Sequence, residues 1–130
     1  MVLAAINVLQ WIRSFLQERS QFVCINNCKS EKREVSSGVP QGSVLGPALF
    51  VYYINDLPQS VSNKVKAKMF ADDTKNYKDI QSAESKEILQ DSIEKLTDWT
   101  EKWLLQFNNQ KCHVLHLGKS NPNYEYEMGE

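Results

Sequence analysis

The stretch KVKAKMFADDTKNYKDI, residues 64–80, places two adjacent carboxylates, Asp72 and Asp73, between two runs of strand-like residues. In the first run lysines alternate with apolar residues, so one face carries Lys64, Lys66 and Lys68 and the other Val65, Ala67 and Met69. Such alternation is typical of a β-strand with one face in water, because successive side chains point to opposite faces. The pattern predicts a β-hairpin with both aspartates at its tip.

Two carboxylates on one tight turn repel, since each disfavours ionisation of the other. A hard divalent cation such as Mg²⁺ is their usual partner. Phe70 would anchor one arm of the hairpin, and the small Ala71 would let a substrate approach the backbone closely. The simpler alternative is turn chemistry, because Asp is favoured in hairpin loops for its local hydrogen bonds. Taken by itself, the Asp-Asp dipeptide favours that alternative.

The rest of the chain alternates between helical and strand-like patterns. Apolar side chains at helical spacing predict helices in residues 2–16 and 82–107. A third helix, which we expect to be buried, is predicted after the Gly-rich loop 37–47. Alternation and turn residues predict strands in residues 21–26, 32–37, 111–118 and 124–128. This order of elements predicts an α+β domain, with helices packed on one face of a mainly antiparallel sheet.

Length and composition indicate one domain that folds in water. The chain has 130 residues, 42% apolar and 24% charged, with a net charge of -1. Near-neutral charge argues against a protein that grips nucleic acid unaided. We expect no membrane contact, because no apolar run approaches the roughly 18 residues that a spanning helix needs. The three cysteines fit free thiols in a reducing compartment, so we expect an intracellular protein, cytoplasmic or nuclear.

Other groups of residues have plainer interpretations. Cysteines and histidines at positions 24, 28, 112, 113 and 116 suggest zinc, but a regular strand would send the two histidines to opposite faces. Cys112 is expected to pack as a small apolar side chain. The alternating lysines are more typical of a solvated face than of a nucleic-acid track. Trp99 and Trp103, at helical spacing, are expected in the core.

Several longer stretches together resemble one protein family. SGVPQGSVLGP (residues 37–47), YINDLP (53–58), FADD (70–73) and FNNQKCHVLHLG (107–118) are similar in wording and order to the palm of reverse transcriptases. The resemblance is to the LINE-type, jockey-like branch of non-LTR retrotransposons, and it extends from position 11 to the C-terminus. It implies a partial polymerase palm that, in intact form, copies RNA into DNA.

The resemblance also implies roles for particular residues. Asp72 and Asp73 match the family's metal-binding aspartates, which hold Mg²⁺ or Mn²⁺ for two-metal nucleotidyl transfer. Phe70 and Ala71 flank them beside the nucleotide. The motif that packs under the template and incoming nucleotide matches Pro40, Gln41, Gly42 and Ser43. Lys111 matches a lysine near the nucleotide's phosphates. The implied partners are an RNA template, a DNA primer and a dNTP.

One feature of the family is missing from the sequence. The family takes a third carboxylate from a strand that precedes the first helix, and nothing before Glu18 is acidic. We therefore expect residues 1–130 to form a single partial domain without that strand, the fingers or the thumb, which binds a metal weakly and extends no primer by itself. Two alternatives stay open: a non-catalytic RNA- or protein-binding module derived from a retrotransposon, and a degenerate remnant.

Overall fold

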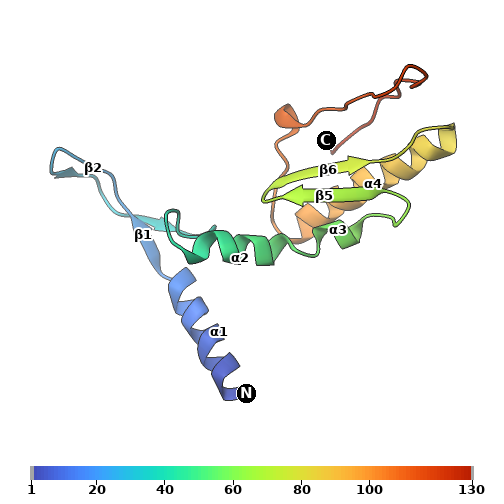
Figure 1. The fold of residues 1–130 in the computed structure, drawn as a ribbon. Helices are drawn as coiled ribbons and strands as arrows, with labels where there is room; N and C mark the ends of the chain where they lie inside the picture. Colours follow the sequence, from blue (N-terminus) through green and yellow to red (C-terminus); the bar gives the residue numbers. More distant parts are fainter. Residues whose placement is uncertain (1, 130) are drawn as a thin grey trace. The chain divides into compact units, whose positions relative to one another are not determined.

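The computed structural model describes residues 2–129 and confirms the α+β class (Figure 1). The chain divides into two compact units, Met1–Phe50 and Val51–Glu130. The strands of the described residues form three separate two-stranded antiparallel ladders. No helix within residues 2–129 is both long enough and apolar enough to cross a membrane.

The first unit contains a helix and an interrupted hairpin. Helix α1 spans Val2–Leu16, as predicted. The hairpin's outer ladder pairs β1 (Arg19–Gln21) with β4 (Arg33–Val35), and its inner ladder pairs β2 (Cys24–Ile25) with β3 (Cys28–Lys29).

The turn of this hairpin lies earlier than the sequence predicts. We expected the polar residues 27–31 to form it, but Asn26 and Asn27 do, with φ of 49° and 65°. A two-residue hairpin turn needs this left-handed conformation so that its twist matches that of the two strands. Asparagine tolerates the conformation better than most residues. The residues that follow are thereby free to pair as β3.

The hairpin of the second unit matches its prediction. Strand β5 (Lys66–Phe70) pairs with β6 (Asp73–Tyr77), from Lys66 opposite Tyr77 at the open end to Phe70 opposite Asp73 at the tip. Exposed and half-buried residues alternate along both strands. The ladder therefore has one face in water and one face toward the protein, as the lysine alternation predicts.

Helix α4 spans Ala83–Lys102 and ends earlier than the predicted position 107. The helix starts where the sequence predicts, and Ser82 is its N-cap: the Ser82 hydroxyl accepts the Ser85 N–H at 3.3 Å. At the other end Leu104 adopts φ 53°. The amides of Leu104 and Leu105 donate to the carbonyls of Glu101 and Thr100 at 3.1 and 2.8 Å. These two backbone hydrogen bonds end the helix even without a glycine, although apolar residues at helical spacing continue to Phe107.

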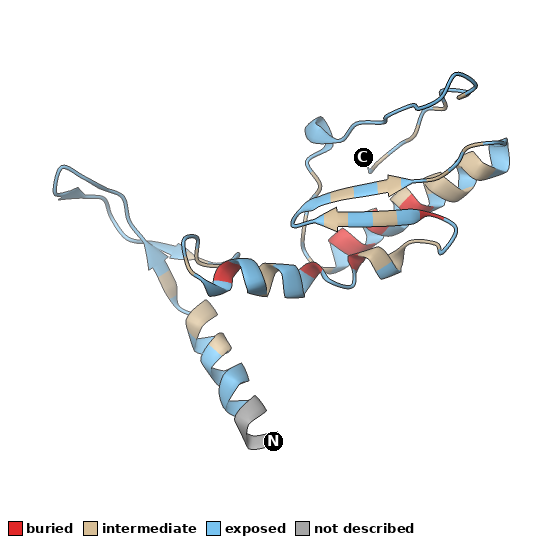
Figure 2. Cartoon of the chain, viewed as in Figure 1, coloured by how far each residue is buried: buried red, intermediate tan, exposed pale blue. Residues whose placement is uncertain are grey.

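The core of the second unit is small. Its buried apolar side chains come from the end of α2 (Leu45–Ile54), from α3 (Leu57–Ser60), from the residue just before β5 and from α4 (Figure 2). They are Ile54, Leu57, Val65, Leu96 and Trp99. Helix α3 contacts both α4 and β5. Figure 1 shows α4 running behind the β5–β6 hairpin, as expected.

Helix α2 is not the buried helix that the sequence predicts. Tyr52 is 83% exposed and Val51 50% exposed, and Gly46 and Ile54 are its only buried residues. The helix is apolar around most of its circumference, whereas the described residues cover only one part of it. Apolar composition predicts the capacity for burial, but burial also needs a neighbouring surface.

The two C-terminal strand predictions are wrong. Residues 111–118 leave a short 3-10 helix, η1 (Asn109–Lys111), and continue without a ladder, and residues 124–128 have no strand partner either. A strand exists only when a neighbouring strand accepts and donates its backbone hydrogen bonds. Residues 124–129 still alternate between half-buried and exposed, so the sequence predicted their extended periodicity but not their lack of pairing.

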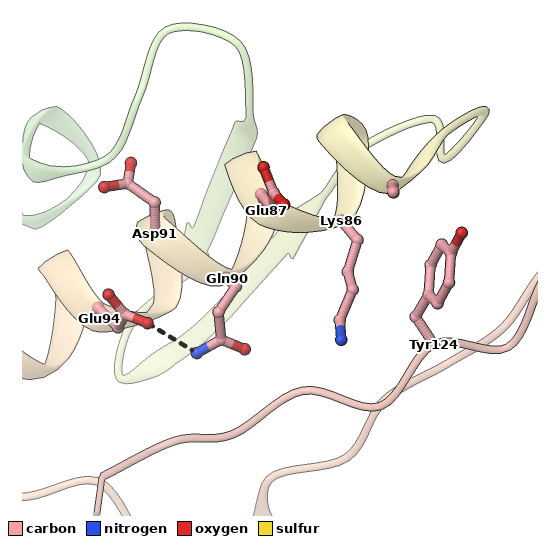
Figure 3. A pocket seen from close by; sticks show the side chains of 7 residues that line it. Lys86, Glu87, Gln90, Asp91, Glu94 and Tyr124 are labelled. Carbon is pink, nitrogen blue, oxygen red and sulfur yellow. Dashed lines mark hydrogen bonds between the residues drawn. The ribbon is translucent and has the colours of Figure 1, made fainter.

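A side chain takes the place of a strand partner at Glu127. The Gln90 amide accepts the Glu127 N–H at 3.0 Å and donates to the Glu127 carbonyl at 2.9 Å. The Lys86 ammonium lies 5.6 Å from the centre of the Tyr124 ring (Figure 3). These contacts from α4 hold the C-terminal segment at two points.

Candidate active site

The two aspartates lie at the tip of the β5–β6 hairpin. Ala71 and Asp72 form its two-residue turn, and Asp73 begins β6 opposite Phe70. Ala71 has φ 51°, in the left-handed region that alanine rarely adopts. Both carboxylates are exposed. The sequence therefore predicted the position of this pair correctly.

Register divides the hairpin's side chains between two faces. The half-buried inner face carries Ala67, Met69, Thr74 and Asn76, of which Asn76 has a buried side-chain oxygen without a hydrogen-bond partner. The exposed outer face carries Lys66, Lys68, Phe70, Asp73, Lys75 and Tyr77. The Phe70 ring is 84% exposed at the tip end of this outer face. It does not anchor the arm; the inner face does.

The tip has the ligand chemistry for a hard cation but few ligands. Carboxylate oxygens are what Mg²⁺ and Mn²⁺ prefer in proteins. Within residues 2–129 no group of three or more His, Cys, Asp or Glu side chains is placed to hold an ion together. A cation bound by Asp72 and Asp73 would therefore keep most of its coordination positions for water or for substrate oxygens.

The loop that precedes α2 belongs to the first unit. Gln41 and Gly42 are exposed, while Pro40 and Ser43 are partly buried. The Ser43 hydroxyl donates to the Pro40 carbonyl at 2.8 Å and accepts the Gly46 N–H at 2.9 Å. The serine thus holds the loop against the start of the helix, and the exposed part of the predicted motif is Gln41 and Gly42.

Gly46 is a structural residue of this loop that sequence reasoning missed. A Cβ at this position would lie 2.8 Å from the Pro40 carbonyl oxygen and 2.9 Å from the Ser43 hydroxyl. Contacts this short are not tolerated, so only glycine fits. Gly42 differs, because its φ of 79° favours glycine although nothing lies within 4 Å of it. The Gly-Pro pair before an apolar run was the available signal for Gly46.

Lys111 and the cysteines complete the predicted residues. Lys111 ends η1 and is exposed. All three cysteines are free and exposed, so the expectation that Cys112 packs in the core is wrong. Cys112 follows η1 in a stretch that forms no ladder, and its thiol donates to the Asn108 carbonyl at 3.4 Å. Pairing of Cys24 with Lys29 and of Ile25 with Cys28 places the two hairpin thiols on opposite faces.

Two contacts between residues 53–56 and residues 99–103 were also missed. The Trp99 indole donates to the Asp56 carboxylate at 3.2 Å, and the Tyr53 hydroxyl donates to the Trp103 carbonyl. The Tyr53 and Trp103 rings meet edge to face, with centroids 5.3 Å apart. YINDLP thus contributes a tyrosine and an aspartate that hold the end of α4. Trp99 lies in the core, as predicted, whereas Trp103 is only half-buried.

A groove on α4 is separate from the carboxylates. It has a volume of about 540 Å³ and is lined by Ala83, Lys86, Glu87, Gln90, Asp91, Glu94 and Tyr124 (Figure 3). Burial, followed by the nearby Tyr124, raises the pKa of Tyr126 in the segment that borders it. The groove is where the C-terminal segment meets α4, and its lining contains neither Asp72 nor Asp73.

The chain belongs to the reverse transcriptase (RNA-dependent DNA polymerase) family, which matches residues 2–126. The hairpin with two aspartates and the loop before α2 both lie within that match. The family that the resemblance predicted is thereby confirmed. No solved structure gives a significant match.

Similar proteins come from mobile elements of flies. The RNA-directed DNA polymerase from mobile element jockey of Drosophila melanogaster is 34% identical over 110 residues, covering 78% of this chain and 12% of that protein. A probable RNA-directed DNA polymerase from transposon X-element of the same species is 33% identical over 125 residues, covering 90% of this chain and 14% of that protein. The chain thus corresponds to a segment of a retrotransposon reverse transcriptase and spans about an eighth of these relatives.

Proposed function

We propose that the β5–β6 tip supplies two carboxylate ligands for metal-dependent nucleotidyl transfer, in a polymerase that copies RNA into DNA. The observation that carries the proposal is the exposed hairpin tip, which carries Asp72 and Asp73 at adjacent positions in a chain of the reverse transcriptase family. Turn chemistry alone does not explain the tip, because it places an alanine rather than a glycine at φ 51°.

The proposed site holds Mg²⁺, or Mn²⁺, through Asp72 and Asp73. When bound, the ion neutralises phosphate charge and orients the oxygens that react. The protein's own contribution is to keep both carboxylates at the end of a paired ladder, where adjacent backbone positions fix their separation. Ala71 leaves room for the nucleotide beside the turn, and the exposed Phe70 offers an aromatic surface to the polynucleotide.

The other predicted residues have supporting roles in this proposal. Gln41 and Gly42, on the exposed part of their loop, contact template or nucleotide, and Gly42 permits close backbone approach. Pro40 and Ser43 position that loop through the hydroxyl's two hydrogen bonds. Lys111 contacts the phosphates of the incoming dNTP. The partners are an RNA template and a DNA primer, inside the cell, in the cytoplasm or the nucleus.

The test is metal binding by the chain as it stands. Titration with Mn²⁺, followed by water proton relaxation, should show weak binding that is lost in Asp72→Asn and in Asp73→Asn. Asp98→Asn, an exposed carboxylate on α4, is the matched control and should bind as the wild type does. Equal binding by all four proteins would contradict the proposed site.

A primer-extension assay tests the reaction itself. The chain alone should not extend a primer, because two carboxylates from one turn leave a two-metal site incomplete. A version lengthened at its N-terminus by the family's preceding strand and fingers should extend it, and Asp72→Asn should abolish that extension. RNA binding without metal binding would instead favour a non-catalytic binding module.

A further inference from the structure

The outer face of the β5–β6 hairpin gathers positive charge on two paired strands. Register sets Lys68 directly opposite Lys75, with Lys66 opposite Tyr77 on one side and Phe70 opposite Asp73 on the other. All six side chains are exposed. The first strand's lysines, expected as a solvated face, thus share their surface with a fourth residue of the same charge on the second strand.

The Lys68–Lys75 pair is unfavourable for the fold. Like charges directly opposite each other in a ladder destabilise it. The one ion pair within residues 2–129 joins Lys95 to Asp91. Lys68 and Lys75 therefore have no carboxylate partner in the described part of the chain. Lysines that protect a sheet edge do not need to face each other across the ladder. An anion between the two ammonium groups would remove the repulsion.

The charge of the hairpin also differs from that of the chain. Residues 64–80 contain five lysines and three aspartates, whereas the remaining residues carry ten basic and thirteen acidic side chains. Attraction for a polyanion is therefore concentrated here, although the whole chain is slightly acidic. This local excess answers the objection that net charge raises against nucleic-acid binding.

Spacing along the strands suits a chain of phosphates rather than a single anion. At about 3.4 Å per residue, the Lys68–Lys75 pair lies about 7 Å from the Phe70–Asp73 pair, and Lys66 about 14 Å from it. The exposed rings of Phe70 and Tyr77 lie at the two ends of this row. Ammonium groups flanked by aromatic rings form a surface for a polynucleotide backbone and its bases.

We propose that this outer face binds the sugar-phosphate backbone of the nucleic acid whose end lies at the aspartates, with Lys68 and Lys75 on either side of one phosphate. The proposal rests on the proposed function and assigns it a binding surface beside the carboxylates. Both lysines act through charge, so the contact is independent of base sequence.

The test uses Lys68→Glu, which should separate binding from stability. Glutamate opposite Lys75 replaces repulsion by attraction, so the variant should unfold at the same or a higher temperature than the wild type. Binding of a fluorescein-labelled RNA–DNA hybrid, measured by anisotropy at several salt concentrations in EDTA, should nevertheless weaken. The slope of log affinity against log salt should become shallower by about 1 or more.

Lys75→Ala should make the slope shallower by about 1, and Lys119→Ala, an exposed lysine of the same unit, should not change it. An unchanged slope in Lys68→Glu, an equal change in Lys119→Ala, or no hybrid binding by the wild type would overturn the proposal. EDTA removes metal, so these outcomes do not depend on the carboxylate site. Conversely, loss of Mn²⁺ binding in Asp72→Asn tests the carboxylates alone.

Discussion

Residues 64–77 and residues 124–129 have the same alternating pattern but different structures. The first stretch enters a ladder, in which β5 and β6 supply each other's backbone hydrogen bonds. The second stretch has the alternating burial of a strand and is held by one glutamine side chain at Glu127. Alternation therefore specifies which side chains face the protein, while strand formation depends on a partner elsewhere in the chain.

The largest expected effect comes from Leu96, on the helix that supports both stretches. Leu96→Ala removes a side chain that is only 3% exposed and should lower the free energy of unfolding by about 2–5 kcal/mol. Urea denaturation followed by tryptophan fluorescence measures the loss. Glu101→Ala, an exposed position of α4, is the control and should change it little. A small loss at Leu96 would mean that the two stretches do not share this support.

Gln90→Ala should affect residues 124–129 and leave the β5–β6 ladder unchanged. It removes both hydrogen bonds to the Glu127 backbone, each with a net value of about 1 kcal/mol. Hydrogen exchange of the Glu127 amide should accelerate roughly tenfold or more, whereas exchange within β5 and β6 should stay the same. Gln90→Glu keeps the acceptor and loses the donor, so its exchange rate should fall between those of wild type and alanine. Equal protection in all three proteins would contradict the role of Gln90.

Ala71→Gly should strengthen the ladder alone. Glycine adopts the φ of 51° without the steric cost that alanine has, so the hairpin should gain about 1 kcal/mol. Thermal unfolding measures the gain, and Ala67→Gly, within β5, should have the opposite sign because glycine weakens a strand interior. Destabilisation by both substitutions would show that the tip is not strained.

Alkaline pH should loosen the C-terminal segment and leave the ladder unchanged. Burial and Tyr124 raise the pKa of Tyr126, so its neutral form is favoured in the folded segment. That contribution is fully present below the unfolded value near 10 and is lost as the pH rises through the folded value. An ultraviolet titration should show a later ionisation in wild type than in Gln90→Ala. Coincident titrations would mean that the segment does not bury this tyrosine.

Sequence alone predicted the hairpin because the whole signal is local. Lysine alternation, two aspartates and a two-residue turn lie within residues 64–77, and the ladder formed as expected. The sequence predicted the start of α4 for the same reason, since its capping residue, Ser82, is also local. The turn of the first hairpin was expected over residues 27–31 but forms at Asn26 and Asn27, because the left-handed preference of the two asparagines outweighed the polarity of the residues after them.

The other failed predictions have two causes: backbone bonds that close a helix, and the lack of a distant partner. The end of α4 is set by backbone bonds around Leu104, against an apolar pattern that continues to Phe107. The strands expected at 111–118 and 124–128 lack a neighbour, and α2 is exposed for the same reason. At the candidate site, the aspartates were predictable from adjacency, whereas Lys75 opposite Lys68 and the close approach at Gly46 depend on register and loop geometry.

The length of the two-residue turn at Ala71 and Asp72 also fixes the register of β6 against β5. If one of the two residues were deleted, Asp73 would be drawn into the turn and β6 would slide by one position along β5. A slip of one residue exchanges the faces of a strand, so Thr74 and Asn76 would point outward and Lys75 toward the protein. The length of this turn therefore determines which side chains of β6 reach water: a substitution changes one side chain, whereas a deletion of one residue exchanges the two faces of the whole strand.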